Sequence, residues 1–470
     1  MKKDTLLKKV EDLSDLDKHQ EIIDMIEALP KKEINNELIG KLARAYIMIQ
    51  NYEKAIEVLK SIEKEEKNTM LWNYRMGCSY FYLEDYEKAE EYFLKAYNLE
   101  LEDENIKDFL MDIYINLSKQ VKFGKDDLDN QKKALNYALK AKDYMTTDDK
   151  KIECYSYLAF LYNKFTEYST AEELLKKAIS LGRDDLWIHS ELGYCLGELN
   201  KLEESLEHYL RAIEIAPSNT WLLSQIAWTY RCLGRYEEAI ENLKKVLEII
   251  NGDKTNDNTD EKIFLNSQIG WIYGKIENSN PEEALYYLYA AKKLGRDDEW
   301  INAEIGWELG YKAVGKDEEA VKYFERAIKL GRNDEWIWIR IADIYFDLKR
   351  YEDALKAYNK AYEFECLHNE GQASLYIRKI GKTLRRLGRY EEAIEKLLES
   401  RKLSLEEGEK VEVEDLELSY CYAILGDRDN GEKYMKLFID SVGVYIENDE
   451  KLKKELEELK EMVNMLYHPS

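Results

Sequence analysis

Apolar residues recur along most of this chain at helical spacing, in segments that come in pairs. The clearest pair occupies residues 300–329, where Ile305 and Leu309 stand on the first segment and Phe324 and Ile328 on the second. Apolar positions three, four and seven residues apart lie on one face of a helix. Small residues stand where two helices have to approach closely, at Gly306, Ala320 and Ala327. The pattern therefore predicts two amphipathic helices that pack against each other.

A short phrase joins such pairs and is itself repeated. Residues 294–300 read LGRDDEW, residues 330–336 read LGRNDEW after a period of 36 residues, and residues 181–187 read LGRDDLW. Gly295 suits the left-handed conformation that ends a helix, and Asp298 can cap the helix that follows. Self-similarity at this period predicts a stacked array in which each unit packs on its neighbours.

The copies resemble the tetratricopeptide repeat, a helix–turn–helix unit of about 34 residues. Each has an aliphatic–small pair or a close variant in its first helix, and most have alanine and aromatic residues in the second. The copies centre on Leu42-Ala43, Met76-Gly77, Leu110-Met111, Leu158-Ala159, Leu192-Gly193, Ile226-Ala227, Ile269-Gly270, Ile305-Gly306, Ile341-Ala342, Ile380-Gly381 and Leu418-Ser419. The resemblance implies an all-α fold, a right-handed superhelical α-solenoid of about eleven repeats with terminal capping helices.

Three parts follow from this organisation. Residues 1–35 are expected to form an N-terminal capping helix pair, residues 36–440 the repeat array, and residues 441–470 a C-terminal capping helix. Array ends need such caps to shield their apolar faces. The alternative for the last helix is dimerisation, so the oligomeric state stays open, with a monomer as one possibility. Polar insertions near 119–131 and 250–261 are expected to be loops.

Composition narrows the classes of partner. The formal net charge of −25 argues against nucleic acid and against anionic lipid surfaces. The six cysteines are scattered, which fits neither a disulfide framework nor a zinc site. The sequence begins without an apolar signal-peptide run and has no stretch long enough to span a membrane. A cytoplasmic protein without membrane contact is expected.

The sequence offers no catalytic motif. Residues 310–316 read GYKAVGK, which is close to a phosphate-binding loop, but Asp317 stands where Ser or Thr is needed and a helix precedes the segment. A calcium loop beginning at Asp253 fails at Asn258 and Phe264. The five histidines form no pair at helical spacing and no cluster with cysteine. We expect no cofactor, no metal ion and no enzymatic activity.

Two rows of aromatic residues are the main candidates for binding. One position of the first helix is taken by Trp187, Trp221, Phe264, Trp300 and Trp336, and the position seven residues later by Tyr194, Trp228, Trp271 and Trp307. Seven residues make nearly two helical turns, so both rows lie on one face. In the resembled family this face lines the concave groove. Two interpretations stay open, namely a binding groove and rings that pad the array. Nearby Gly197, Gly274 and Gly310 are expected to leave floor space for a ligand chain.

The second candidate is a basic cluster on the first helix of the copy around Gly381, made of Arg378, Lys382, Arg385 and Arg386. One interpretation is a solvated set that pairs with acidic neighbours. The other is a contact for a carboxylate or an acidic partner segment. The family's Lys/Asn clamp for C-terminal carboxylates is not matched.

The predicted function is a non-enzymatic scaffold or adaptor that binds a protein or peptide in an aromatic-lined concave groove. Repeat proteins of this kind in bacteria include receptors for short signalling peptides, so a regulatory sensor that changes pitch on binding is the alternative. An enzyme whose site is assembled from distant repeats has no support beyond the number of carboxylates.

Overall fold

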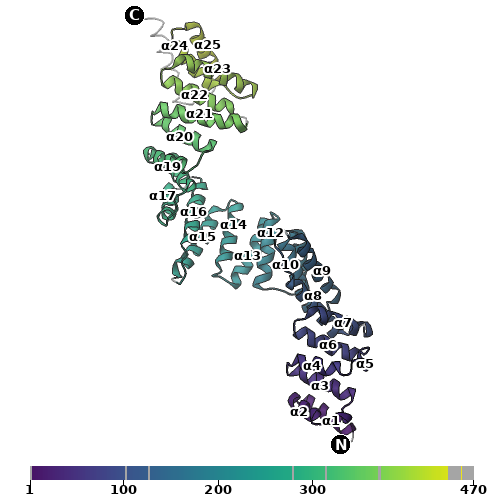
Figure 1. Cartoon of the computed structure of the whole chain (residues 1–470). Coiled ribbons are helices and arrows are strands. Elements are labelled where there is room, and N and C mark those ends of the chain that lie inside the picture. The colour runs from purple at the N-terminus through teal and green to yellow at the C-terminus, as the bar shows by residue number, and fades with distance from the viewer. Residues whose placement is uncertain are drawn as a thin grey trace. The chain divides into compact units, whose positions relative to one another are not determined.

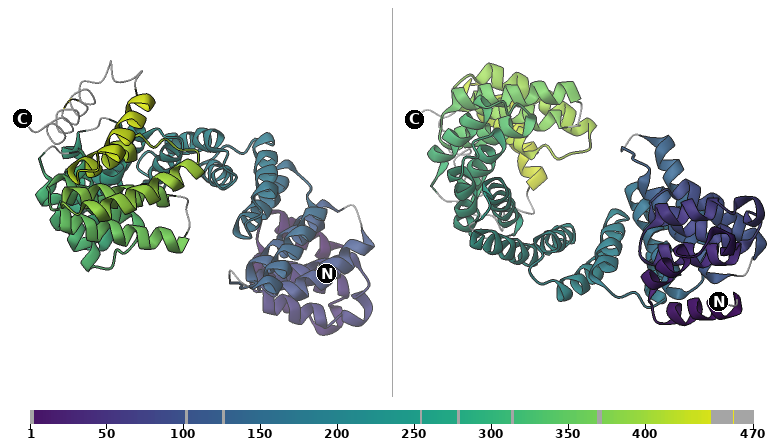
Figure 2. Two further views of the ribbon diagram at one scale, coloured as in Figure 1. Left: turned by 90° about the horizontal axis from the view of Figure 1, so that it is seen from above. Right: turned by 60° about the horizontal axis from the view of Figure 1, so that its bottom comes forward.

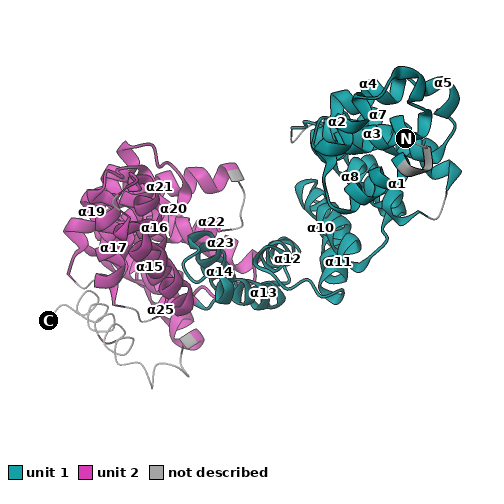
Figure 3. Ribbon diagram, turned by 90° about the horizontal axis from the view of Figure 1, so that it is seen from below, with its two compact units in different colours: residues 1–235 teal, residues 236–470 magenta. Residues whose placement is uncertain are grey.

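The structure is a computed structural model of the whole chain. It describes residues 3–100, 103–124, 127–253, 255–277, 280–312, 315–368, 372–442 and 457. These residues form 25 α-helices and no strand (Figure 1). The chain divides into two compact units, unit 1 (residues 1–235) and unit 2 (residues 236–470), which Figure 3 shows in different colours.

Unit 1 contains a leading helix pair and then helix pairs in strict succession. Its helices are α1 Lys3–Asp15, α2 His19–Glu27, the 3-10 helix η1 Lys31–Glu33, α3 Asn36–Met48, α4 Tyr52–Lys60, α5 Glu63–Glu66, α6 Met70–Tyr82, α7 Tyr86–Leu99, α8 Glu104–Gln120, α9 Leu128–Ala141, the 3-10 helix η2 Lys142–Tyr144, α10 Asp148–Lys164, α11 Tyr168–Ser180, α12 Leu186–Glu198, α13 Leu202–Ile215 and α14 Thr220–Cys232.

Unit 2 continues the succession. Its helices are α15 Tyr236–Gly252, α16 Thr259–Lys275, α17 Pro281–Lys293, α18 Glu299–Trp307, the π-helical segment η3 Glu308–Lys312, α19 Asp317–Lys329, α20 Glu335–Asp347, α21 Tyr351–His368, α22 Ala373–Arg386, α23 Tyr390–Glu406, α24 Glu412–Ile424 and α25 Arg428–Val442. From α3 onward the described helices give eleven pairs in sequence, α5 aside, as predicted, and the sixth pair is divided between the units.

Within each unit the two helices of a pair pack as a hairpin, and hairpins stack on their neighbours (Figure 2). The close approach depends on the small residue of the first helix. A side-chain carbon at Gly77 would lie 2.8 Å from the ring of Phe93, and one at Gly193 would lie 2.8 Å from the ring of Tyr209. Both rings are buried. Each unit is therefore an α-solenoid whose core runs between helices.

The repeated phrase acts as predicted. Gly182, Gly295 and Gly331 have φ angles of 105, 116 and 115°, the left-handed region that favours glycine. The Asp298 carboxylate then accepts the backbone N–H of Ile301 at 2.8 Å and caps α18. The same capping bond is made by Asp185 at the start of α12 and by Asp334 at the start of α20.

The ends and insertions can be placed only in part. Residues 3–33 form α1, α2 and η1, where a capping pair is expected. The two polar insertions contain the connections between α8 and α9 and between α15 and α16. The expected C-terminal capping helix at 441–470 lies outside the described residues, apart from positions 441, 442 and 457.

Candidate functional site

The first aromatic row is not uniform in its packing. Trp187, Trp300 and Trp336 are half-buried, and an arginine Cζ lies 4.5, 4.5 and 5.0 Å from their ring centroids. That arginine comes from the repeated phrase, four residues earlier, and it also pairs with the capping aspartate. Trp221 and Phe264 have no such arginine four residues before them, and they are 47% and 57% exposed. Three rings of the row are thus held by the phrase, and two are open to solvent.

The second row shows the same division. Its half-buried members are Tyr194, Trp271 and Trp307. Trp307 is partly covered, since it stacks on Tyr311 with a centroid distance of 4.2 Å and the Cζ of Arg340 lies 4.8 Å from its ring and 5.3 Å from that of Tyr311. Trp228 is 39% exposed. Of the nine predicted partner-binding residues, Trp221, Trp228 and Phe264 are the rings most available to a ligand.

The predicted floor space beside the rows is filled at Gly274 and Gly310, whereas a side-chain carbon at Gly197 would make ordinary contacts, 3.4 Å from Oγ of Ser205 and 3.7 Å from the ring of Trp228. A side-chain carbon at Gly274 would lie 2.5 Å from Oε1 of Glu308, and one at Gly310 would lie 2.4 Å from Cδ1 of Ile344. These glycines allow neighbouring side chains to pack against the helix backbone. The expectation that they make room for a ligand chain is therefore wrong.

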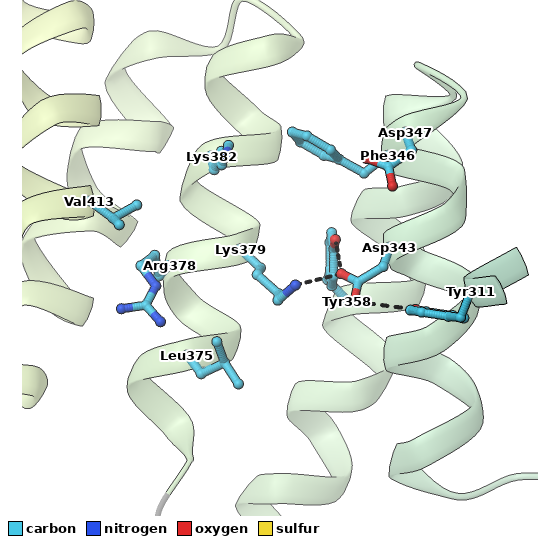
Figure 4. Close-up of a pocket in the computed structure, with 10 residues that line it drawn as sticks. All are labelled: Tyr311, Asp343, Phe346, Asp347, Tyr358, Leu375, Arg378, Lys379, Lys382 and Val413. Atoms are coloured by element: carbon cyan, nitrogen blue, oxygen red, sulfur yellow. Dashed lines mark hydrogen bonds and ion pairs between the residues drawn. The ribbon is translucent and has the colours of Figure 1, made fainter. Parts of the chain in front are cut away.

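A pocket of about 470 Å³ opens in unit 2 along α22 (Figure 4). Four successive helix pairs contribute to it. Its lining residues are Tyr311 of η3, Asp343, Phe346 and Asp347 of α20, Tyr358 of α21, Leu375, Arg378, Lys379 and Lys382 of α22, and Val413 of α24. A ligand that fills this pocket touches several repeats at once.

Asp343 is the fixed acidic centre of the pocket. Its carboxylate accepts hydrogen bonds from Lys379 Nζ at 2.5 Å, from the hydroxyl of Tyr358 at 2.6 Å and from the hydroxyl of Tyr311 at 3.5 Å (Figure 4). Burial and the Asp343 charge both raise the pKa of Tyr358, so the phenol stays a donor at neutral pH. The carboxylate is already well satisfied by the protein, which leaves little of it for a ligand.

Lys382 differs from its neighbours in the pocket. Its Nζ lies 5.5 Å from the ring centroid of Phe346, and no carboxylate among the described residues forms an ion pair with it. Burial, and then the charge of Asp343, raises the pKa of Asp347, whereas the lysines of α22 lower it. The pocket thus combines an apolar wall with one ammonium group that is not neutralised by an ion pair.

The predicted basic cluster is split by its partners. Arg378 lies at the pocket, with Nη1 3.5 Å from Oε1 of the fully buried Glu414, and Arg385 pairs with the buried Glu417. Both acidic residues belong to α24, the first helix of the next pair. Arg386 is exposed and points to no described carboxylate. The structure therefore places Arg378 and Lys382 in one pocket and ties Arg385 to α24.

Sequence reasoning missed most of this pocket, although a signal for part of it was present. Leu375 and Val413 occupy the position of the first aromatic row in later repeats, and Asp343 and Lys382 occupy that of the second row. Counting these positions past Trp336 would have found them. Tyr311 could not be found in this way, because η3 is π-helical and shifts the register of the face.

Other chemistry is not visible in the described ranges. No helix there has the length and apolar character that a membrane crossing requires. No three histidine, cysteine, aspartate or glutamate side chains of the described residues come together as metal ligands would. Gly315, in the segment that resembles a phosphate-binding loop, has a φ of +76° and lies in the turn before α19.

Two family models, both described as tetratricopeptide repeat, match the chain. One matches residues 184–252 and 333–406, and the other matches residues 73–103 and 311–334. No curated protein sequence matches. These matched segments cover parts of both units; three of them lie on helix pairs of the structure, and residues 311–334 contain the end of η3 and α19.

Solved structures with similarity to the chain include three helical repeat proteins. YrrB, a TPR protein with an unusual peptide-binding site, is 24% identical and aligns over 41% of this chain and 93% of its own, with a TM-score of 0.33. The C-terminal part of a TPR repeat-containing protein from Cytophaga hutchinsonii is 15% identical and aligns over 63% of this chain and 98% of its own, with a TM-score of 0.38. A chain of the APC/C hetero-tetramer Cut9–Hcn1 is 13% identical and aligns over 98% of this chain and 96% of its own, with a TM-score of 0.37. The matching family models, together with the described helix pairs, identify tetratricopeptide repeats in the matched segments of this chain.

Proposed function

We propose that this protein is a non-enzymatic scaffold that binds an extended segment of a partner protein along the first helices of its repeats. The observation that carries the proposal is the pocket of about 470 Å³ on unit 2, because four successive helix pairs line it. A protein segment lying across the repeats meets all four pairs. Small-molecule sites are in general more enclosed than this open face.

The chemistry of the lining describes the segment. Phe346, Leu375 and Val413 offer apolar contacts, and Val413 is 43% exposed. Lys382 offers an ammonium group for a carboxylate, with Arg378 beside it. A segment that carries an apolar side chain next to an acidic one satisfies both features. The exposed rings Trp221, Trp228 and Phe264 are the members of the aromatic rows that we propose as further contacts, each within its own unit.

The first test places a photo-reactive phenylalanine analogue at Phe346 and, as a matched control, at Tyr286. Tyr286 is 69% exposed but lies on α17, a second helix away from the pocket. In native lysate we expect a cross-linked partner protein from position 346 and none from position 286. The same partner should bind the Lys382→Glu variant about tenfold more weakly, since a charge-assisted contact is replaced by repulsion.

The control for charge is Lys402→Glu, on the exposed face of α23, which should bind the partner as the natural protein does. Equal cross-linking from positions 346 and 286 would show that the pocket has no special role. Unchanged affinity of Lys382→Glu, measured with the cross-linked partner, would remove the acidic contact from the proposal.

A further inference from the structure

Unit 1 contains an arginine pair whose position is unlike that of any other cation described above. Arg75 of α6 lies against the backbone of α3, so that a side-chain carbon at Gly40 would be only 2.5 Å from its Nη1. Glycine at this place lets the guanidinium rest on the neighbouring first helix. Arg44 follows Gly40 by four residues on α3 and so lies on the same helical face.

The two guanidinium groups act on each other as like charges. Burial, and after it the positive charge of Arg44, lowers the pKa of Arg75 to about 10. Glu66 of α5 is the one carboxylate whose charge raises the pKa of Arg75. Its oxygens already accept hydrogen bonds from Asn36 at 3.2 Å and Thr69 at 3.4 Å. Within the described part of the chain, neither guanidinium group has a hydrogen bond or an ion pair.

This arrangement is the reverse of the one in unit 2. There Arg378 and Arg385 meet the buried carboxylates of Glu414 and Glu417, so these two arginines are neutralised by the protein itself. A partly buried cation beside a like charge and without a counter-ion is electrostatically unfavourable. It is unexpected in a protein of net charge −25, in which carboxylates are abundant. Binding of an anionic group would relieve the strain.

The surroundings of the pair indicate what kind of anion fits. Large apolar side chains flank the arginines on the same two helices, at one-turn or two-turn spacing. They are Leu71 and Tyr82 on α6, both 49% exposed, and Met48 on α3, 51% exposed. Free inorganic ions would make no use of these side chains, whereas a protein segment would cover them.

We propose that Arg44 and Arg75 form a second binding site, on unit 1, for an acidic segment of a protein in which carboxylate and apolar side chains alternate. The two guanidinium groups hold one carboxylate between α3 and α6, and Leu71, Met48 and Tyr82 receive the apolar residues on either side. Guanidinium groups are well shaped for carboxylates, because they donate parallel hydrogen bonds. The site lies outside the pocket of unit 2 and does not depend on it.

The test uses fluorescence anisotropy of the full chain with a fluorescein-labelled peptide that alternates glutamate and leucine. Every protein in this comparison also carries Lys382→Glu, so that the pocket proposed on unit 2 does not compete for the peptide. Arg44→Gln and Arg75→Gln should each weaken binding about tenfold, as expected for a lost hydrogen bond to a charged group. Arg44 is exposed, so its variant keeps the fold even if the Arg75 variant does not. Raising the salt to 0.5 M should weaken binding by the protein with both arginines more than by either variant.

Two controls and a third peptide, in which phosphoserine replaces glutamate, make the outcome decisive. Lys60→Gln removes one positive charge from the exposed face of the second helix α4, and it should leave the affinity unchanged. A peptide that alternates glutamine and leucine should bind at least tenfold more weakly than the glutamate peptide if the arginines provide a charged contact. Unchanged affinity in both arginine variants, equal binding of the glutamine peptide, or binding only of a phosphoserine version would overturn the proposal. The Phe346 cross-link is unaffected by any of these results, so the two proposals fail separately.

Discussion

At the residue scale, glycine and aspartate set the geometry of each repeat. Gly270 of α16 lies so close to α17 that a side-chain carbon there would be 2.8 Å from Cγ of Leu288 and 3.0 Å from the carbonyl oxygen of Ala284. A leucine can rotate away, but a helical carbonyl cannot. The backbone of α17 therefore requires a small residue at position 270. Repacking of core side chains cannot remove this requirement, because the carbonyl oxygen is fixed by its helix.

Gly270→Ala should lower the free energy of unfolding by about 1–3 kcal/mol, the usual cost of overpacking a close contact. The matched control is Gly252→Ala at the end of α15, where nothing lies within 4 Å of the added carbon and φ is not positive. That variant should be neutral or slightly stabilising, because alanine favours helix more than glycine does. Urea unfolding followed by circular dichroism measures both. Equal stability of the two variants would show that α16 and α17 can move apart at little cost.

The same scale shows where a single sequence stops being informative. The left-handed glycine and capping aspartate of the repeated phrase were predictable, because both act on their own backbone. The arginine over Trp300 was not predicted, since its role depends on side-chain directions that residue types do not give. This arginine decides whether a ring of the first row is covered or open, so the exposure of the rings became known only from the contacts in the structure.

At the element scale, each hairpin brings together residues that sequence spacing keeps apart. His189 of α12 and His208 of α13 are 19 residues apart and form no helical pattern, yet their Nδ1 atoms are 2.9 Å apart. The ring centroids are 5.2 Å apart, so the rings meet through their edges. Nε2 of His189 lies 2.7 Å from Asp184, whose carboxylate can only accept, so this nitrogen carries a hydrogen. His208 then donates its Nδ1–H to His189.

This arrangement tolerates one added proton but not two, because two protonated Nδ1 atoms would face each other. Burial, then the charge of His189 and that of Lys176, lowers the pKa of His208, and Glu204 opposes them weakly. Arg211 and Asp184 form the outer part of the cluster. A histidine whose pKa is lowered by folding gives stability that is present above its ordinary value of about 6.5 and is lost as the pH falls below it.

Thermal unfolding of the natural protein should therefore show a loss of melting temperature between about pH 7 and pH 5 that the His208→Gln variant lacks. Carboxylates titrate in both proteins, so the difference between the two profiles isolates the histidine pair. His19, which lies on α2 away from this hairpin, supplies the control in the form of His19→Gln, whose profile should follow that of the natural protein. Parallel profiles for His208→Gln and the natural protein would contradict this account.

Elements also explain why the fold was predictable and part of the pocket was not. Eleven helix pairs follow from a pattern repeated in register, so that a degenerate copy is recognised by its place among the others. One wall of the pocket arises where the pattern fails, at η3, where the π-helical turn brings Tyr311 to the carboxylate of Asp343. Such a local departure leaves no signature in a pattern that is averaged over repeats.

At the scale of the whole molecule, charge and architecture act differently. A net charge of −25 repels other acidic molecules in general and favours solubility. It does not choose a partner. We propose that this choice belongs to particular cations that have no ion pair with a described carboxylate, namely Lys382 in unit 2 and the pair Arg44 and Arg75 in unit 1.

The architecture also decides how far a local change is felt. In each unit the helices pack mainly with the helices next to them in sequence, so stability is expected to be a sum of terms for neighbouring pairs. Gly270→Ala should then reduce hydrogen-exchange protection in α16 and α17 and, less strongly, in α15 and α18. Protection in α22–α25 and in α3–α13 should stay as in the natural protein. Mass spectrometry of peptic fragments resolves these segments, and the Gly252→Ala variant supplies the baseline. A uniform loss of protection along the chain would mean that the repeats unfold as one cooperative body, and a partner that binds across four pairs could then be released by a single local change.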